Sequence, residues 1–159
     1  PYGYEGLGEV FVFLFFGIVA VAGSYFVQVK HLDWKAFALA VPVGLLASAI
    51  LVVNNFRDID SDRRAGKRTL AVRWGRDRTR TMFAVIVYVA FLLAPVTWVF
   101  GPMKPWLLLP WLTLPLAAQI VREVRNRTDG PSLNQALAHT GMLQLAFCTL
   151  LSAGLLLSR

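Results

Sequence analysis

The residues with the clearest chemical potential are amides and carboxylates that follow an apolar stretch. Asn54, Asp58 and Asp62 recur at intervals of four residues. If a helix continues past Val53, this spacing puts their side chains on one face, and Asn55 borders the same face. Mg²⁺ prefers hard oxygen ligands and is usually held by one or two carboxylates together with substrate phosphates. We therefore expect Asn54, Asp58 and Asp62 to hold Mg²⁺, with Asp58 and Asp62 as the catalytic pair.

Basic side chains surround these oxygens. Arg57 precedes Asp58, and Lys67 and Arg68 follow Gly66, which can form a tight turn that brings the chain back. Arginine suits bidentate phosphate contacts, and lysine acts as a point charge. A metal site beside a basic cluster at a membrane surface is suited to a lipid diphosphate. The predicted diphosphate ligands are Arg57, Lys67, Arg68 and Asn55.

The composition places this segment in a membrane protein. Of the 159 residues, 57% are hydrophobic and 16% are charged, against roughly 45–50% and about 25% in soluble domains. Five ranges contain no Asp, Glu, Lys or Arg, and each is about long enough to cross a hydrocarbon core of ~30 Å. They are residues 10–27, 36–53, 81–103, 105–121 and 131–158.

The expected fold is all-α: a polytopic bundle of transmembrane helices, forming a single transmembrane domain over 1–159. Helices are favoured over a β-barrel because the apolar runs are continuous and do not alternate with polar residues. The predicted spans are 8–28, 35–55, 80–101, 105–122 and 132–157.

The distribution of basic residues predicts the orientation. Five spans place loops 54–80 and 122–131 on one side, with twelve Lys and Arg, and leave four on the other side. The positive-inside rule therefore puts both loops in the cytoplasm. Because the basic residues lie between apolar runs, we do not expect a nucleic-acid partner.

Two ionisable groups in the predicted spans have open roles. Glu9 begins the first span, and it is either an anion favoured by a helix N-terminus or part of an acceptor site. His139 lies inside the last span, where it either bonds to a neighbouring helix or takes part in function.

The segments 54–62 (NNFRDIDSD) and 66–73 (GKRTLAVR) resemble the second aspartate-rich motif of UbiA-type membrane prenyltransferases. Residues 6–17 (GLGEVFVFLFFG) are also similar to the branch that prenylates 1,4-dihydroxy-2-naphthoate. The resemblance extends over about 1–157 and is sharpest at 54–73. It implies a bundle of nine helices in which two aspartate-rich motifs hold Mg²⁺ and a polyprenyl diphosphate.

On that resemblance, the five spans correspond to the last five of the nine helices. We therefore expect 1–159 to be a C-terminal piece that is inactive without the helices carrying the first motif. The implied reaction transfers a polyprenyl group to an aromatic acceptor, here 1,4-dihydroxy-2-naphthoate, in menaquinone biosynthesis. The implied location is a bacterial plasma membrane, and the implied partners are the two substrates and the lipid bilayer.

Two other functions stay open. Asp62-Arg63 followed by Gly66-Lys67-Arg68 faintly resembles the cytoplasmic loop signature of major-facilitator transporters. A secondary transporter leaves Asn54, Asn55 and Asp58 without a role. A non-enzymatic membrane subunit whose basic loop binds a partner or anionic lipid is the other alternative.

Overall fold

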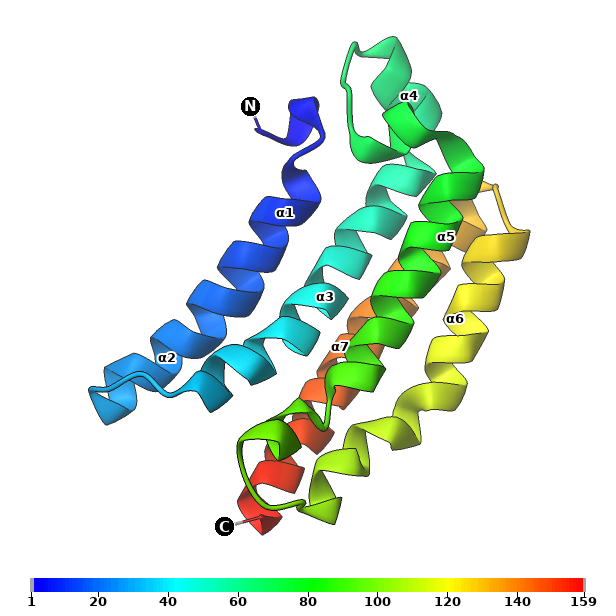
Figure 1. Cartoon of the computed structure of the whole chain (residues 1–159). Coiled ribbons are helices and arrows are strands. Elements are labelled where there is room, and N and C mark those ends of the chain that lie inside the picture. Colours follow the sequence, from blue (N-terminus) through cyan, green and yellow to red (C-terminus); the bar gives the residue numbers. More distant parts are fainter. Residues whose placement is uncertain (1, 159) are drawn as a thin grey trace.

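The computed structural model describes residues 2–158, and every regular element in that range is a helix. Long helical segments lie side by side and run alternately up and down (Figure 1). The N-terminus lies at the end that carries α4 (Ile59–Arg64), and the C-terminus lies at the opposite end. The predicted all-α bundle is confirmed.

The first long segment is continuous but not uniform. It consists of α1 (Gly8–Val12), the π-helix η2 (Phe13–Val19) and α2 (Ala20–Val29). It ends at Lys30, whose left-handed conformation (φ 62°) stops the helix, with its N–H donating to the Phe26 carbonyl. The predicted span 8–28 is confirmed, whereas the π-helix was not predicted.

The second long helix, α3 (Trp34–Arg57), is the centre of the bundle. Its first turn is capped by Asp33, whose side chain accepts a hydrogen bond of 2.8 Å from the Lys35 N–H. It packs against the first segment, α5 (Leu70–Leu93) and α7 (Gly130–Leu157). The predicted span 35–55 is therefore confirmed.

The predicted loop 54–80 is largely helical. α3 continues to Arg57, α4 follows, and α5 begins at Leu70, where Thr69 accepts a hydrogen bond from the Val72 N–H. The helical path of α5 is interrupted at Gly75, with φ 76° and ψ 178°.

The predicted span 80–101 is wrong at both ends, because α5 starts at Leu70 and stops at Leu93. The helix ends just before Pro95, which has no N–H to donate to the Phe91 carbonyl. That carbonyl accepts from the Ala94 N–H at 3.2 Å and from Trp111 Nε1 at 2.9 Å. A short 3₁₀ helix, η3 (Val96–Phe100), follows.

The last two spans agree with prediction to within a few residues. η4 (Pro105–Thr113) passes into α6 (Leu114–Asn126), where 105–122 was predicted, and α7 covers the predicted 132–157. Asp129 caps α7 by accepting a hydrogen bond from the Ser132 N–H. Hydrogen bonding with the side chain and the N–H of Ser132 lowers the pKa of Asp129.

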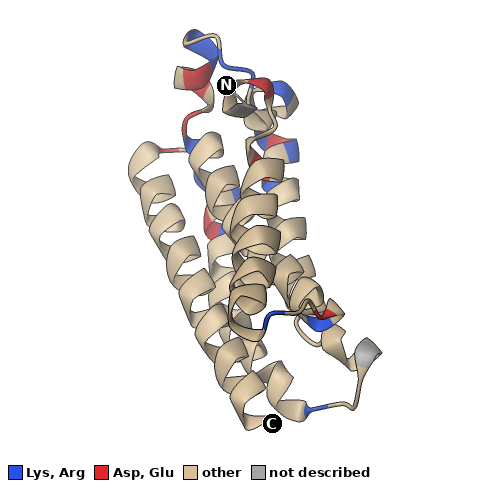
Figure 2. Ribbon diagram, turned by 90° about the vertical axis from the view of Figure 1, so that its left-hand side faces the viewer, with Lys and Arg blue, Asp and Glu red and all other residues tan. Residues whose placement is uncertain are grey.

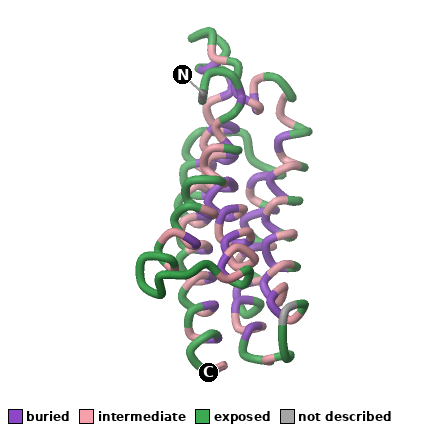
Figure 3. Tube along the Cα trace, turned by 60° about the vertical axis from the view of Figure 1, so that its left-hand side comes forward, coloured by how far each residue is buried: buried purple, intermediate pink, exposed green. Residues whose placement is uncertain are grey.

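The buried residues line the inward faces of the helices (Figure 3). One close helix approach joins the first segment to α3, where a Cβ on Gly17 would lie 2.6 Å from the Gly44 Cα. Close approach at small residues is typical of helix packing in membranes. At the far end, Gly154 of α7 packs against the Trp106 backbone in the same way.

Four helical segments are long and apolar enough to cross a membrane: Gly8–Val29, Trp34–Arg57, Pro105–Asn126 and Gly130–Leu157. The helix α5 lies among them, but its first part carries Arg73, Arg76, Asp77, Arg78 and Arg80. Acidic and basic residues gather at the end of the bundle that carries α4 (Figure 2). Which end faces the cytoplasm stays a prediction.

Candidate active site

The amides and carboxylates identified in the sequence lie where α3 passes into α4. The Asp58 N–H donates to the Asn54 carbonyl at 3.1 Å, and the Asp62 N–H donates to the Asp58 carbonyl at 2.8 Å. The helical hydrogen-bond spacing therefore continues through the junction. As the spacing predicts, the side chains of Asn54, Asp58 and Asp62 line one cavity.

Gly66 closes α4 and returns the chain to this face. It adopts φ 72°, its N–H donates to the Arg63 carbonyl, and the Lys67 N–H donates to the Asp62 carbonyl at 2.9 Å. This pair of bonds is the Schellman arrangement of a helix C-terminus. It places Lys67 Nζ 2.8 Å from Asp62 Oδ1, so the predicted turn is confirmed.

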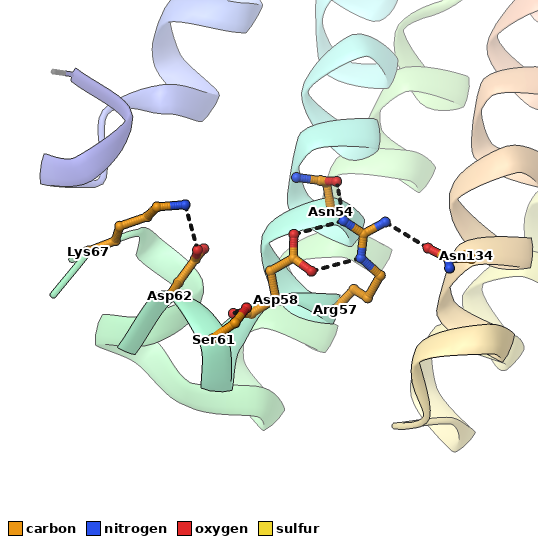
Figure 4. A network of polar contacts seen from close by, with 7 residues as sticks. All are labelled: Asn54, Arg57, Asp58, Ser61, Asp62, Lys67 and Asn134. Carbon is orange, nitrogen blue, oxygen red and sulfur yellow. Dashed lines mark hydrogen bonds and ion pairs between the residues drawn. The ribbon is translucent and has the colours of Figure 1, made fainter. Parts of the chain in front are cut away.

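Arg57 makes the densest set of contacts (Figure 4). Its Nε and Nη2 donate to the two carboxylate oxygens of Asp58, at 2.8 and 2.7 Å. Nη2 also donates to Asn54 Oδ1 at 3.0 Å, and Nη1 donates to Asn134 Oδ1 on α7 at 2.7 Å. This side chain therefore ties α3 to the last helix.

The two carboxylates are paired with different cations. The hydrogen bond from Arg57 lowers the pKa of Asp58, against the opposing effect of burial. The hydrogen bond to Asp62 raises the pKa of Lys67. Both shifts favour the charged forms at neutral pH, so this end of the bundle has charges of both signs beside the cavity.

The polar cavity, as we call the space between these groups, has a volume of about 360 Å³. The 3₁₀ helix η1 (Tyr2–Glu5) forms one wall. The Arg68 N–H donates to the Tyr4 carbonyl at 2.8 Å, and Lys67 Nζ lies 5.4 Å from the centre of the Tyr4 ring. The residues that line the polar cavity are Gly3, Tyr4, Asn54, Asn55, Asp58, Asp62, Lys67 and Thr69.

A second cavity of about 410 Å³ lies between the first segment, α3 and α7. We call it the apolar cavity, because most of its lining is aliphatic or aromatic. Asn54 lines both cavities. The lining residues are Val12, Phe16, Ala47, Ile50, Leu51, Asn54, Leu137 and Gln144.

Two predicted diphosphate ligands lie outside the polar cavity. The guanidinium of Arg57 points toward α7 (Figure 4). Arg68 is exposed and makes no side-chain hydrogen bond or ion pair within residues 2–158. The predicted residues that the structure does bring together there are Asn54, Asn55, Asp58, Asp62 and Lys67.

Sequence reasoning missed four residues of this site: Gly3, Tyr4 and Thr69 in the lining of the polar cavity, and Asn134 beside Arg57. Asn134 accepts the hydrogen bond from Arg57. An asparagine in the first turns of an apolar span was the available signal for Asn134. Its partner, however, lies 77 positions away in the sequence, so helical spacing gave no indication of the pair.

The polar cavity is lined by carboxylate and amide oxygens that could hold a metal ion. No three His, Cys, Asp or Glu side chains within residues 2–158 are gathered closely enough to hold one. Two carboxylates with two amides nevertheless fit Mg²⁺, which keeps several waters and takes its remaining ligands from substrate phosphates. They do not form a site closed by these protein side chains alone.

Both ionisable residues of uncertain role have partners on a neighbouring helix. Glu9 is buried, and Asn55 Nδ2 on α3 donates to its Oε1 at 2.9 Å. His139 Nδ1 lies 3.1 Å from Glu123 Oε2 on α6, as expected for a histidine that joins two helices.

The sequence of the chain matches a known protein family over most of its length. The sequence model of the UbiA prenyltransferase family matches residues 1–151. The chain belongs to this family. As a UbiA-family chain with several long apolar helices, it is an integral membrane protein.

Curated relatives agree with this assignment. The chain is 41% identical over 155 residues to 1,4-dihydroxy-2-naphthoate octaprenyltransferase of Mycobacterium tuberculosis, covering 98% of this chain and 52% of that protein. It is 35% identical over 159 residues to the Escherichia coli protein of the same name, covering 100% and 52%. The UbiA prenyltransferase domain-containing protein 1 homolog of Drosophila melanogaster is 39% identical over 124 residues, covering 77% and 34%. The chain thus spans about half the length of the bacterial relatives.

Proposed function

We propose that this UbiA-family protein transfers a polyprenyl group from polyprenyl diphosphate to 1,4-dihydroxy-2-naphthoate, with Mg²⁺, in menaquinone biosynthesis. The observation that carries the proposal is that Asn54 lines both the polar cavity and the apolar cavity. A lipid diphosphate has the same division, with a charged head joined to an apolar chain. The names of the bacterial relatives support the acceptor and the pathway.

Five residues of the polar cavity have a role in this proposal. Asp58 and Asp62 are the carboxylates that would hold Mg²⁺, with Asn54 and Asn55 offering amide oxygens. The ion, when bound, would neutralise charge on the diphosphate as a Lewis acid. Lys67 lies at the same cavity and would add a positive charge next to the leaving group.

The ion pairs give the cations a second role. Arg57 and Lys67 neutralise Asp58 and Asp62 in the structure. We expect these cationic side chains to exchange part of their contact with the carboxylates for contact with the diphosphate when the donor binds. Arginine is suited to that exchange, because its planar fork fits carboxylate and phosphate equally.

The proposed transfer breaks one bond in each substrate and forms one new C–C bond. The allylic C–O bond of the donor breaks, and the diphosphate leaves with its electron pair. The ring carbon bearing the carboxylate forms the new C–C bond, and CO₂ leaves its bonding pair in the ring. The apolar walls beside Asn54 would keep water from the allylic cation.

The location is part of the proposal. We place residues 1–159 as one transmembrane unit in a bacterial plasma membrane, with 54–80 and 122–131 cytoplasmic. The charged residues at the α4 end of the bundle support this orientation. The transporter alternative gains no support from the family match or the relatives.

The test is prenyl transfer in membranes that contain the entire product of the gene encoding these residues. Labelled polyprenyl diphosphate would be supplied with several aromatic acids, with Mg²⁺ present or chelated. We expect Mg²⁺-dependent product with 1,4-dihydroxy-2-naphthoate. Product with another aromatic acid alone would overturn the acceptor, and no product with any acceptor in folded protein would overturn the enzyme.

The matched variants are Asp58→Asn and Asp60→Asn. Both remove one carboxylate charge from α4 or its cap, but Asp60 is exposed and pairs with Arg76 outside the cavity. We expect Asp58→Asn to lower transfer on the order of 10²-fold, while Asp60→Asn stays near wild type.

A further inference from the structure

Glu9 is a buried carboxylate that the proposed chemistry does not use. It is 6% exposed, its Oε1 accepts the hydrogen bond from Asn55 Nδ2, and its backbone carbonyl accepts one from Ser48 Oγ at 3.0 Å. Its Oε2 is buried without a hydrogen-bond partner in the described part of the chain. A buried carboxylate with so few partners lowers the stability of the fold. This cost suggests that Glu9 is buried there for function.

The backbone directs Glu9 toward α3. Gly17, which touches Gly44 of α3, lies eight positions after Glu9. In a regular α-helix, eight positions would rotate the two residues about 80° apart. The π-helix η2 begins between them and includes Gly17, and it puts more residues into each turn, which reduces this angle. Both Glu9 and Gly17 are thereby buried on the same side.

The contact fixes the direction of the Asn55 amide. A carboxylate can only accept hydrogen bonds, so Asn55 must turn its NH₂ group to Glu9. The amide oxygen of Asn55 is then the atom left for other partners, and it has no hydrogen-bond donor within residues 2–158. Asn55 lines the polar cavity together with Asp58 and Asp62.

We propose that Glu9 is a positioning residue that holds Asn55 with its Oδ1 toward the polar cavity, as an oxygen ligand for the divalent cation. This inference rests on the proposed function, because it requires a cation at Asp58 and Asp62. The π-helix serves the same end by keeping Glu9 over Asn55. Glu9 acts through Asn55 and need not touch the substrate.

The test measures cation binding directly, without turnover. The entire gene product would be purified in detergent and titrated with Mn²⁺, a stand-in for Mg²⁺, while free Mn²⁺ is followed by electron paramagnetic resonance. Glu9→Met keeps the length and burial but removes the acceptor, and we expect it to weaken Mn²⁺ binding about tenfold, as loss of an outer hydrogen-bond partner does. Glu9→Gln can still accept from Asn55 and should bind Mn²⁺ within about twofold of wild type.

The controls separate positioning from charge and from folding. Glu5→Gln removes a carboxylate charge from an exposed side chain four residues earlier and should leave Mn²⁺ binding unchanged. In a double-mutant cycle, Asn55→Leu should weaken binding, and adding Glu9→Met should weaken it no further. If Glu9→Met does not fold, the loss with Asn55→Leu and retention with Glu9→Gln still test the contact.

Three results would overturn the inference. Unchanged Mn²⁺ affinity in folded Glu9→Met, with loss in Asp58→Asn, rejects the role of Glu9 and leaves the proposed function standing. Additive losses in the cycle show that Glu9 does not act through Asn55. Unchanged affinity in both Asp58→Asn and Asp62→Asn removes the cation site itself, and with it the metal part of the proposed function.

Discussion

The two ends of the bundle differ in how far their hydrogen bonds reach along the chain. At the end without α4, the side-chain hydrogen bonds made by the connections 30–35 and 94–104 join described residues at most six positions apart, and the bond from Trp111 to the Phe91 carbonyl spans 20 positions. At the α4 end, Arg57 reaches Asn134 across 77 positions, and Asn55 reaches Glu9 across 46.

Both ends use the same local means to turn the chain. Lys30 at one end and Gly66 at the other take a left-handed conformation after a helix. Only the second turn brings a cation to a buried carboxylate, since Lys67 contacts Asp62, which is 5% exposed. The difference teaches that a turn requires only local sequence, whereas this site requires three helices held in register.

The largest effect should come from a charge at the α4 end. Asp62→Asn keeps the shape of the side chain but removes the partner of Lys67 and one predicted metal ligand. We expect prenyl transfer by the entire gene product to fall on the order of 10²-fold or more. Asp60→Asn is the control, because Asp60 does not line the polar cavity. Equal losses of transfer in the two variants would contradict a specific role for the carboxylate that faces the cavity.

The next effect should appear in stability. Gly17→Ala would place a Cβ 2.6 Å from the Gly44 Cα and 3.0 Å from the Ala40 carbonyl oxygen. Because both neighbours are backbone atoms, we expect a loss of about 1–3 kcal/mol, measured by thermal unfolding in detergent. Gly23→Ala on the same segment meets nothing within 4 Å and should be neutral or slightly stabilising. Equal unfolding temperatures would contradict the close packing.

A smaller effect should follow from Arg57→Lys. Lysine keeps the charge but cannot hold both oxygens of Asp58 and also reach Asn134. Losing one charge-assisted hydrogen bond is worth about 1.5 kcal/mol, so transfer should fall roughly tenfold. Arg63→Lys, at an exposed position of α4, is the control. Retention of wild-type transfer in Arg57→Lys would show that transfer does not need the bidentate contact between the guanidinium and Asp58.

The smallest effect should come from the opposite end. Lys104→Gln removes a positive charge from the connection before η4, where the Lys104 backbone carbonyl accepts from Trp98 Nε1. We expect unchanged transfer and a stability change within about 0.5 kcal/mol, followed by assay and unfolding of the same preparation. A substantial loss of transfer would contradict the claim that the functional residues lie at the α4 end alone.

Local periodicity explains what the sequence predicted well. The common face of Asn54, Asp58 and Asp62 and the turn at Gly66 depend on neighbouring residues, so their spacing was sufficient. The apolar runs likewise predicted the long helices. The error at 80–101 arose because polar residues 70–80 can form helix, and because Pro95 ends the helix inside an apolar run.

Other features depend on contacts between distant segments. The π-helix, the contact between Glu9 and Asn55, and the bond between Arg57 and Asn134 have no periodic signature. They follow from the approach of the first segment and α7 to α3. Sequence spacing likewise gave no sign that the Arg57 guanidinium, a predicted diphosphate ligand, also contacts α7.

The most direct measurement is equilibrium binding of labelled polyprenyl diphosphate to the entire gene product in lipid nanodiscs, with Mg²⁺ present or chelated. We predict binding that requires Mg²⁺, is lost in Asp58→Asn and is retained in Asp60→Asn. Equal affinity with chelator, or wild-type affinity in Asp58→Asn, would contradict the assignment of the polar cavity as the diphosphate site.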